Sequence, residues 1–178
     1  MVKPKLLVHI CCAPDALYVM DLLSGDYDLL GYFDNPNIHP RSEYDLRLSE
    51  TRRVADVLKF KLYEGPSDPE GWLNAVRRFR DEPEKGRRCD ICYALRLDRT
   101  ARLASVLGCD LFTTVMSLSP WKKAVSINRI GSMLARRHGI GFLAADFKKK
   151  DGFRRSVALS RQHDLYRQDY CGCRYSRR

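Results

Sequence analysis

Paired cysteines are the residues of this sequence best suited to chemistry. Six of the seven cysteines fall into three closely spaced pairs, and the first pair is followed by a carboxylate three residues later. Thiolates bind soft metal ions and iron–sulfur clusters, and a carboxylate adds a harder oxygen ligand. The candidate metal ligands are Cys11, Cys12, Asp15, Cys89, Cys92, Cys171 and Cys173.

The first pair lies where an open α/β fold usually binds its ligand. Residues 6–8 form an apolar run and residues 16–23 have helical character, so Cys11 and Cys12 are expected in a turn between a strand and a helix. Ligands of such folds bind outside the carboxyl ends of the strands, and this turn often carries a phosphate-binding glycine loop. Because cysteine occupies the turn here, the sequence indicates metal chemistry rather than nucleotide binding.

The elements that position these residues alternate along the chain. Apolar runs rich in β-branched residues predict strands, and apolar positions at helical spacing predict helices between them. The alternation predicts an α/β fold with one domain over residues 1–178 and a doubly wound, mostly parallel, Rossmann-like sheet. Strands are expected at residues 27–33, 60–63, 110–115 and 141–144, and helices at residues 42–58, from Cys92 to residue 107, and at residues 122–137.

Basic residues are concentrated near the third cysteine pair. The net charge is +10, and residues 148–178 alone carry ten Lys or Arg and three Asp. Because three tyrosines are interleaved with these charges, the segment suits a nucleic acid, although a solvated basic surface is the simpler alternative. No run of about 18 apolar residues is present, so we expect a cytoplasmic protein with no membrane contact. The candidate contacts to nucleic acid are Lys148, Lys149 and Arg154.

Five sequence blocks resemble the QueH family of epoxyqueuosine reductases. Together they run from residue 9 to residue 173, in the order found in that family. The blocks are His9-x-Cys11-Cys12-Ala13-Pro14; Asn35-Pro36-Asn37-Ile38-x-Pro40 with Glu43-Tyr44; Cys89-x-x-Cys92-Tyr93 with Arg96-Leu97; Ser119-Pro120-x-Lys122; and Tyr166-Arg167-Gln168-x-Tyr170-Cys171-Gly172-Cys173.

The resemblance implies an oxidoreductase that acts on tRNA. The reaction is reduction of the epoxide of epoxyqueuosine, at the wobble position of certain tRNAs, to the cyclopentene of queuosine. The implied cofactors are a 4Fe–4S cluster and a nearby mononuclear iron, without cobalamin, and the electrons come from an external one-electron donor. Separately, the expected doubly wound topology resembles the HUP or ATP-pyrophosphatase type of fold, and we expect kinship of fold without use of ATP.

The number of paired thiols suggests how two metal centres could share them. One 4Fe–4S cluster takes four cysteines, so six thiols and one carboxylate leave three further ligands for a single iron. Adjacent side chains in an extended turn tend to point apart, which predicts that each outer pair divides between the centres. An iron with three protein ligands keeps positions open for a substrate oxygen. The expected division is Cys12, Cys89, Cys92 and Cys171 for the cluster, with Cys11, Asp15 and Cys173 for the iron.

Other polar residues of these blocks are candidates for proton transfer or substrate contact. His9 and Tyr93 are candidate catalytic residues, although a strand histidine or a helix tyrosine is often only structural. Asn35 and Asn37 follow the second expected strand at the same sheet edge. Further candidate substrate contacts are Tyr44 and Ser119.

Three other readings of the cysteines stay open at this stage. The protein could be a tRNA-binding module with structural zinc, which would be colourless and would leave two thiols unused. It could be a thiol oxidoreductase built on Cys89 and Cys92, which leaves the other paired cysteines without a role. The third alternative is kinship with tRNA-modifying enzymes that use ATP. The sequence has no glycine-rich phosphate-binding motif, which argues against the use of ATP here.

Overall fold

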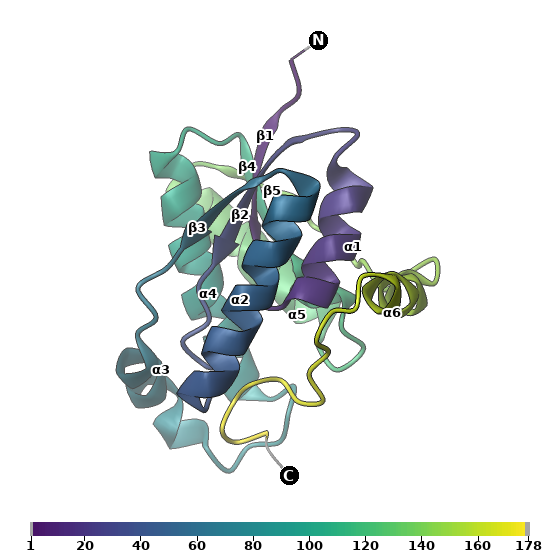
Figure 1. Ribbon diagram of the computed structural model, residues 1–178. Coiled ribbons are helices and arrows are strands. Elements are labelled where there is room, and N and C mark those ends of the chain that lie inside the picture. The colour runs from purple at the N-terminus through teal and green to yellow at the C-terminus, as the bar shows by residue number, and fades with distance from the viewer. Residues whose placement is uncertain (1, 177–178) are drawn as a thin grey trace.

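The computed structural model describes residues 2–176, and its centre is a five-stranded parallel sheet between two layers of helices (Figure 1). The expectation of an α/β fold with a doubly wound sheet is confirmed. The strands are β1 (Lys5–His9), β2 (Asp28–Phe33), β3 (Lys61–Glu64), β4 (Leu111–Thr114) and β5 (Gly141–Phe142). The helices are α1 (Ala13–Leu23), α2 (Arg41–Leu58), α3 (Pro69–Val76), α4 (Arg87–Val106), α5 (Ala124–His138) and α6 (Gly152–Gln162), with 3-10 turns η1 (Arg77–Phe79) and η2 (Val115–Leu118).

The strand order places a binding crevice beside β1. The order across the sheet is β3-β2-β1-β4-β5, so the chain first builds outward from β1 on one side and then returns to build on the other. α1 and α2 cover one face and α4 and α5 the other (Figure 1). Ligands of such sheets bind at the reversal point, here outside the carboxyl ends of β1 and β4. The first cysteine pair directly follows β1 at this point.

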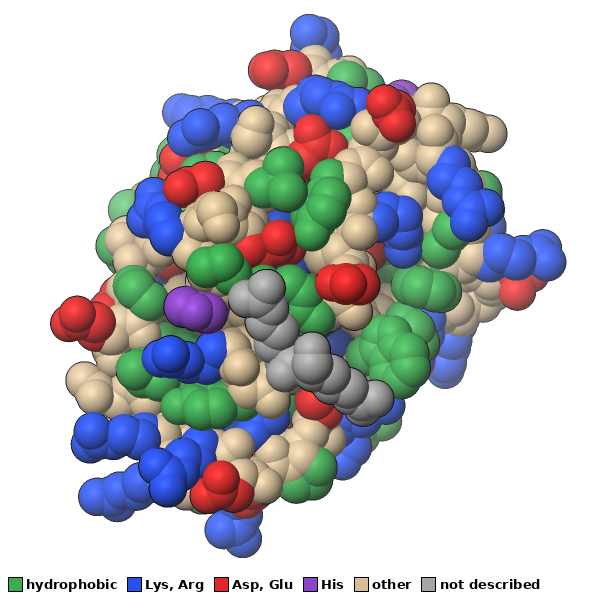
Figure 2. All heavy atoms as spheres, turned by 60° about the horizontal axis from the view of Figure 1, so that its bottom comes forward, with side chains coloured by type: hydrophobic (Ala, Val, Ile, Leu, Met, Phe, Trp, Pro, Cys, Tyr) green, Lys and Arg blue, Asp and Glu red, His purple; other side chains and the backbone are tan. Residues whose placement is uncertain are grey.

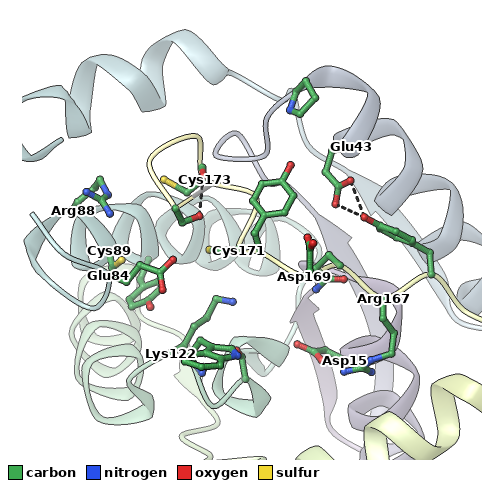
Figure 3. A pocket seen from close by; sticks show the side chains of 18 of the residues that line it. Asp15, Glu43, Glu84, Arg88, Cys89, Lys122, Arg167, Asp169, Cys171 and Cys173 are labelled. Carbon is green, nitrogen blue, oxygen red and sulfur yellow. Dashed lines mark hydrogen bonds between the residues drawn. The ribbon is translucent and has the colours of Figure 1, made fainter. Parts of the chain in front are cut away.

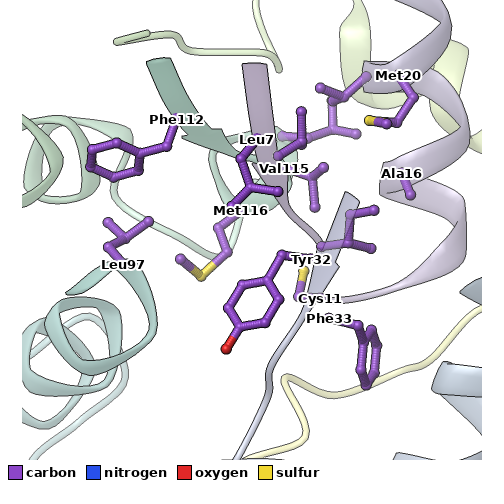
Figure 4. Packing of buried hydrophobic residues seen from close by; sticks show 14 of the residues in the cluster. Leu7, Cys11, Ala16, Met20, Tyr32, Phe33, Leu97, Phe112, Val115 and Met116 are labelled. Atoms are coloured by element: carbon purple, nitrogen blue, oxygen red, sulfur yellow. The ribbon is translucent and has the colours of Figure 1, made fainter. Parts of the chain in front are cut away.

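β1 is the most deeply buried strand because helices cover both of its faces. Leu6, Leu7 and Val8 are all fully buried, which explains why the strand is continuously apolar rather than alternating. Leu7 and Met116 lie between the helix layers in Figure 4, and Cys11 and Phe33 belong to the same buried cluster. The core therefore extends to the metal-ligand turn and holds it on a rigid base.

The carboxyl-terminal part of the chain contains a helix that was not expected. α6 lies against α1 (Figure 1), and the hydroxyl of Ser156 donates to the Pro14 carbonyl at 3.0 Å. Much of the basic segment is therefore an ordered element that packs on the first helix. Arg177 and Arg178, the last two cations of that segment, lie outside the described residues. Within residues 2–176, no helix combines the length and apolar character needed to cross a bilayer.

Candidate metal centre

The turn after β1 brings two thiols and a carboxylate together. One ligand atom each from Cys11, Cys12 and Asp15 lies within 4.8 Å of the other two, and all three residues are buried. Cys12 has an extended backbone (φ −164°, ψ 157°) and immediately precedes α1, in whose first turn Asp15 lies. The expectation that the adjacent thiols point apart is therefore wrong, because the chain enters the helix directly after Cys12 and turns the carboxylate back toward both sulfur atoms.

The electrostatics of this group favour a bound cation. A hydrogen bond from Cys12 lowers the pKa of the Cys11 thiol, and the cations of Lys122 and Arg96 act in the same direction. Burial, together with negative charge on Cys11, raises the pKa of Asp15 to about 7. Three buried acidic groups in contact repel one another when ionised, and a divalent metal ion would remove that repulsion.

The other four paired cysteines gather at the start of α4 and in the carboxyl-terminal segment. Cys92 and Cys173 are buried in a second apolar cluster with Trp72, and Cys171 packs against it. Burial raises the pKa of the Cys89 and Cys92 thiols, and it raises the pKa of Cys173 to about 12. Negative charge on Cys171 acts in the same direction on all three. Without a metal, the thiols of Cys89, Cys92 and Cys173 are therefore protonated at neutral pH.

A set of contacts from α2 and the loop before it holds the carboxyl-terminal cysteines in place. Arg47, which is 2% exposed, donates to the carbonyls of Tyr170 and Cys171 at 3.1 and 3.2 Å. The His39 N–H donates to the Gly172 carbonyl at 2.8 Å. Gly172 has φ +98°, and a side chain there would come within 2.9 Å of Ile38. Glycine between the two cysteines is therefore required by both conformation and space.

Asp15 of the first ligand group and Cys89, Cys171 and Cys173 of the second line one cavity at the carboxyl end of the sheet (Figure 3). Cys11, Cys12 and Cys92 are buried and are not part of its lining. Its volume is about 800 Å³, within the usual range for a small-molecule site. In Figure 3, the Lys122 side chain reaches from the wall toward the middle, with Cys89 and Cys171 on one side and Asp15 on the other. The residues of its lining that matter here are Asp15, Cys89, Tyr93, Ser119, Lys122, Cys171 and Cys173.

Unpaired donors beside the four-cysteine group fit a sulfur-rich anion. The indole N–H of Trp72 lies next to the Cys92 thiol, and neither it nor the Arg96 Nε has a hydrogen-bond partner among residues 2–176. Arg96 Nη1 is 3.9 Å from the Cys92 sulfur, and the Lys85 N–H donates to the Cys89 sulfur at 3.3 Å. Because buried donors are rarely left unpaired, thiolates of an iron–sulfur cluster are suitable acceptors for them.

Two polar residues expected in the site are engaged by the protein itself. The ring nitrogens of His9 lie 3.0 Å from the Thr114 hydroxyl and 3.2 Å from the Asp34 carbonyl. Since a carbonyl only accepts, Nε2 carries the proton, and burial holds the pKa of His9 well below its usual range. Asn35 donates to the Ile10 carbonyl and accepts from Arg96. Both residues connect strand ends beneath the cavity.

Two other expected residues differ in their surroundings. Asn37 is 1% exposed, and neither polar atom of its side chain has a partner among the described residues. Tyr44 does not line the main cavity. It packs edge-on against Phe33 and borders a separate hollow with Arg52 and Glu64.

The candidate nucleic-acid contacts have unequal access to solvent. Lys148 is half-buried and pairs with Asp146 at 2.8 Å. Lys149 is exposed, as is Arg154, which pairs with Asp151 at 3.4 Å. Figure 2 shows Lys and Arg side chains around the margin of the face that contains the carboxyl ends of the strands. Cations, with acidic side chains between them, therefore border the face onto which the cavity opens.

Lys122 is a cavity residue that the sequence argument did not assign to the site. Burial acts to lower the pKa of the Lys122 ammonium. Negative charge on Cys171, Cys11 and Asp15 outweighs burial and raises that pKa above its usual range. Within residues 2–176, its Nζ makes no hydrogen bond or ion pair. Its position after Ser119-Pro120, at the carboxyl end of a central strand, was the available signal.

Solved structures with the same fold include proteins of tRNA modification. The U34-tRNA thiolase NcsA from Methanococcus maripaludis, solved with its [4Fe-4S] cluster, has a TM-score of 0.62 and 12% identity. The match covers 100% of this chain and 63% of NcsA. A predicted subunit of tRNA methyltransferase from Methanocaldococcus jannaschii has a TM-score of 0.57 and 14% identity, covering 88% of this chain and 76% of that one. These similarities support the expected ATP-pyrophosphatase-like fold.

Relatives with higher identity cover almost the whole chain. An epoxyqueuosine reductase QueH from Streptococcus pyogenes serotype M1 is 38% identical over 98% of this chain and 71% of its own length. The QueH of Thermotoga maritima is 34% identical over 96% of this chain and 88% of its own length. The family model for epoxyqueuosine reductase QueH matches residues 6–178. This chain therefore belongs to the epoxyqueuosine reductase QueH family, as its cysteine motifs suggested.

Proposed function

We propose that this protein reduces the epoxide of epoxyqueuosine in tRNA to the alkene of queuosine, with a 4Fe–4S cluster, an adjacent mononuclear iron and no cobalamin. Membership of the family supports the reductase activity and a tRNA substrate. The observation that carries the cofactor proposal is that two ligand groups of different composition meet at one cavity, the first through Asp15 and the second through Cys89, Cys171 and Cys173. NcsA, which has the same fold, holds a 4Fe–4S cluster.

The geometry supports a division of ligands different from the one expected from the sequence. Because Cys12 lies with Cys11 and Asp15, these three residues are the proposed ligands of the single iron. The remaining four paired cysteines then supply one thiolate for each iron of the cluster. In this division Cys12 and Cys173 exchange places, and the proposed cluster ligands are Cys89, Cys92, Cys171 and Cys173.

The reaction defines what the protein must provide. Converting an epoxide to an alkene takes two electrons and two protons and releases water. When bound, the metal groups would deliver electrons singly from an external one-electron donor and polarise the C–O bond. The side chains must supply at least one proton, neutralise negative charge on the oxygen, and hold the substrate over the metal ligands.

Lys122 is the residue best placed to handle the proton. Its ammonium reaches into the cavity (Figure 3) and stays charged at neutral pH because acidic groups surround it. As the C–O bond breaks, Nζ would donate a proton to the departing oxygen and regain one from solvent. Tyr93 and Ser119 also line the cavity and are proposed substrate contacts. His9 has a positioning role, since both of its ring nitrogens are engaged.

Anaerobic reconstitution tests this proposal. The loaded protein should contain roughly five irons and four sulfides per chain, counting four of each for the cluster and one further iron. It should convert epoxyqueuosine to queuosine in tRNA when given a low-potential one-electron reductant and no cobalamin, as measured by nucleoside analysis. A colourless zinc protein that binds tRNA without converting it would instead favour the tRNA-binding module.

A further inference from the structure

Trp121 is an exposed aromatic side chain at the mouth of the metal-lined cavity. It lines the cavity together with Ser119 and Lys122, yet it is 68% exposed. The other tryptophan, Trp72, is 4% exposed and packs in the cluster beside Cys92. Tryptophan is highly buried on average, so an open indole beside a substrate cavity is suited to contact a ligand.

The backbone that carries Trp121 is ordered. The Trp121 N–H donates to the Ser119 hydroxyl at 3.3 Å, and the Lys122 N–H donates to the Ser119 carbonyl at 3.2 Å. α5 begins three residues later, at Ala124. The turn between β4 and α5 therefore holds the backbone of Trp121 beside the entrance, so only side-chain freedom is lost when a ligand stacks on the indole.

Cations surround the indole. Lys85 Nζ lies 5.9 Å from the centre of the ring and 3.4 Å from the Pro120 carbonyl, to which it donates. Lys123 follows as an exposed cation, and Lys122 extends into the cavity. One nearby carboxylate, Glu84, also lines the cavity. An aromatic face among cations is the combination that binds single-stranded nucleic acid, because bases stack on the ring while phosphates meet the charges.

We propose that Trp121 stacks on a nucleobase next to the wobble nucleotide of the anticodon loop. This inference rests on the proposed function, in which the wobble base enters the cavity. An enzyme that acts on a base must take it out of its stack, and the neighbouring nucleotide then stays at the entrance. Trp121 replaces the stacking partner that this neighbour loses, and Lys85 and Lys123 face the loop phosphates.

The test is a coupling measurement between the protein and the RNA. Binding of a synthetic anticodon stem-loop is measured for the loaded wild type, Trp121→Ala and Trp121→Phe, with Val106→Ala as the control. Val106 is 82% exposed at the far end of α4. Removing a stacking aromatic should weaken binding by about 5- to 150-fold. Trp121→Phe should retain most of the affinity, and Val106→Ala all of it.

Abasic RNA separates stacking from other effects of the substitution. An abasic nucleotide on one side of the wobble position should weaken wild-type binding by a similar factor and leave Trp121→Ala binding unchanged. The proposal is overturned if an abasic nucleotide weakens the binding of Trp121→Ala as much as the binding of the wild type, on whichever side of the wobble position it is placed. The proposal is also overturned if Trp121→Ala binds RNA normally but accepts electrons more slowly from a protein donor. That result would assign the surface around Trp121 to the electron donor.

Fluorescence gives a readout that is independent of catalysis. In the free protein, acrylamide should quench Trp121, whereas Trp72 is shielded by burial. In the wild type, binding of the stem-loop should therefore reduce the fraction of the fluorescence that acrylamide can quench. Trp121→Phe should lack this quenchable fraction with or without RNA. Because binding and fluorescence are measured without turnover, they can still be interpreted if the wild-type protein does not reduce epoxyqueuosine. The two proposals can therefore fail independently of each other. An accessible indole that RNA does not protect contradicts stacking.

Discussion

Arg96 donates to the side-chain oxygen of Asn35 at 2.6 Å, and this contact joins the two halves of the metal site. The Asn35 amide also donates to the Ile10 carbonyl at 2.9 Å, immediately before Cys11. Arg96 lies one helical turn after Cys92, and both members of the pair are buried. One buried amide therefore fixes the distance between the turn that carries Cys11 and the helix that carries Cys92.

Replacing Asn35 by alanine is expected to destabilise the protein. The buried Arg96 guanidinium would lose its neutral acceptor, and the Ile10 carbonyl would lose its donor. Leaving such groups unpaired costs about 3 kcal/mol of the free energy of unfolding, which urea titration of the metal-free protein can measure. Asn74→Ala, at an exposed position on α3, is the control. An effect of Asn35→Ala no larger than that of Asn74→Ala would contradict the joining role.

The sequence was sufficient to predict the sheet and its functional edge, because short apolar strands and glycine or proline breaks leave a strong pattern. It was less informative about the ligand sets. The closeness of Cys12 to Asp15 depends on the first turn of α1, and spacing alone does not give that geometry. Similarly, Asn35 and His9 resemble reactive residues in sequence, and only tertiary contacts show that they bind the protein itself.

α6 and Lys122 illustrate two further limits of sequence analysis. α6 has few large apolar residues, and its contact with α1 uses Gly152 and Ser156, which do not form an apolar stripe. Lys122 was expected at the start of a helix but precedes it by two residues. At this position its side chain lines the cavity. Helix boundaries are set by local contacts such as the Ser119 turn, which hydrophobic periodicity does not record.

Serine substitutions should separate the two proposed metal centres. Cys92→Ser is expected to remove the visible absorption of the cluster and most of the iron and sulfide. Cys12→Ser should retain roughly four irons and four sulfides and lose the single iron. Cys109→Ser is the matched control, because Cys109 is buried directly before β4, at the amino-terminal edge of the sheet, opposite the edge that carries Cys11 and Cys12. If Cys12→Ser lost the cluster instead, the division expected from the sequence would be restored.

The pH dependence of stability should change with Asp15. In the metal-free folded protein its pKa is raised to about 7 from 3.8, so the protonated form is favoured by folding. This stability is fully present below about pH 4 and is lost as the pH rises through 7. Metal-free Asp15→Asn should therefore be more stable than the wild type above pH 7, by at most about 4 kcal/mol.

Urea titrations at pH 5 and pH 8 measure this difference. Asp26→Asn, at an exposed position, should show no comparable change between the two pH values. With iron bound, the order should reverse, because Asp15→Asn loses a metal ligand. A metal-free Asp15→Asn protein that is less stable than the wild type at pH 8 would contradict the predicted role of burial.

Neutralising Lys122 should affect catalysis more than binding. Lys122→Met removes the proposed proton donor, for which general acid catalysis typically contributes about 10²- to 10⁴-fold. The expected result is a fall of that size in kcat with a small change in KM, measured on protein whose iron and sulfide are shown to be normal. Arg137→Met removes an exposed cation in the last turn of α5, outside the cavity lining, and should keep kcat. Equal kcat values for the two variants would exclude Lys122 as the donor.

Charge reversal in the basic segment should weaken tRNA binding in a salt-dependent way. Lys149 and Arg154 are exposed, so each can contact a phosphate, and each lost contact should reduce the slope of log K against log salt by about 1. Lys149→Glu and Arg154→Glu should each lower affinity at low salt, and the difference from the wild type should shrink as salt rises. Arg136→Glu reverses an exposed charge in the last turn of α5 and is the matched control. A larger loss with Arg136→Glu than with either segment variant would place the tRNA on another face.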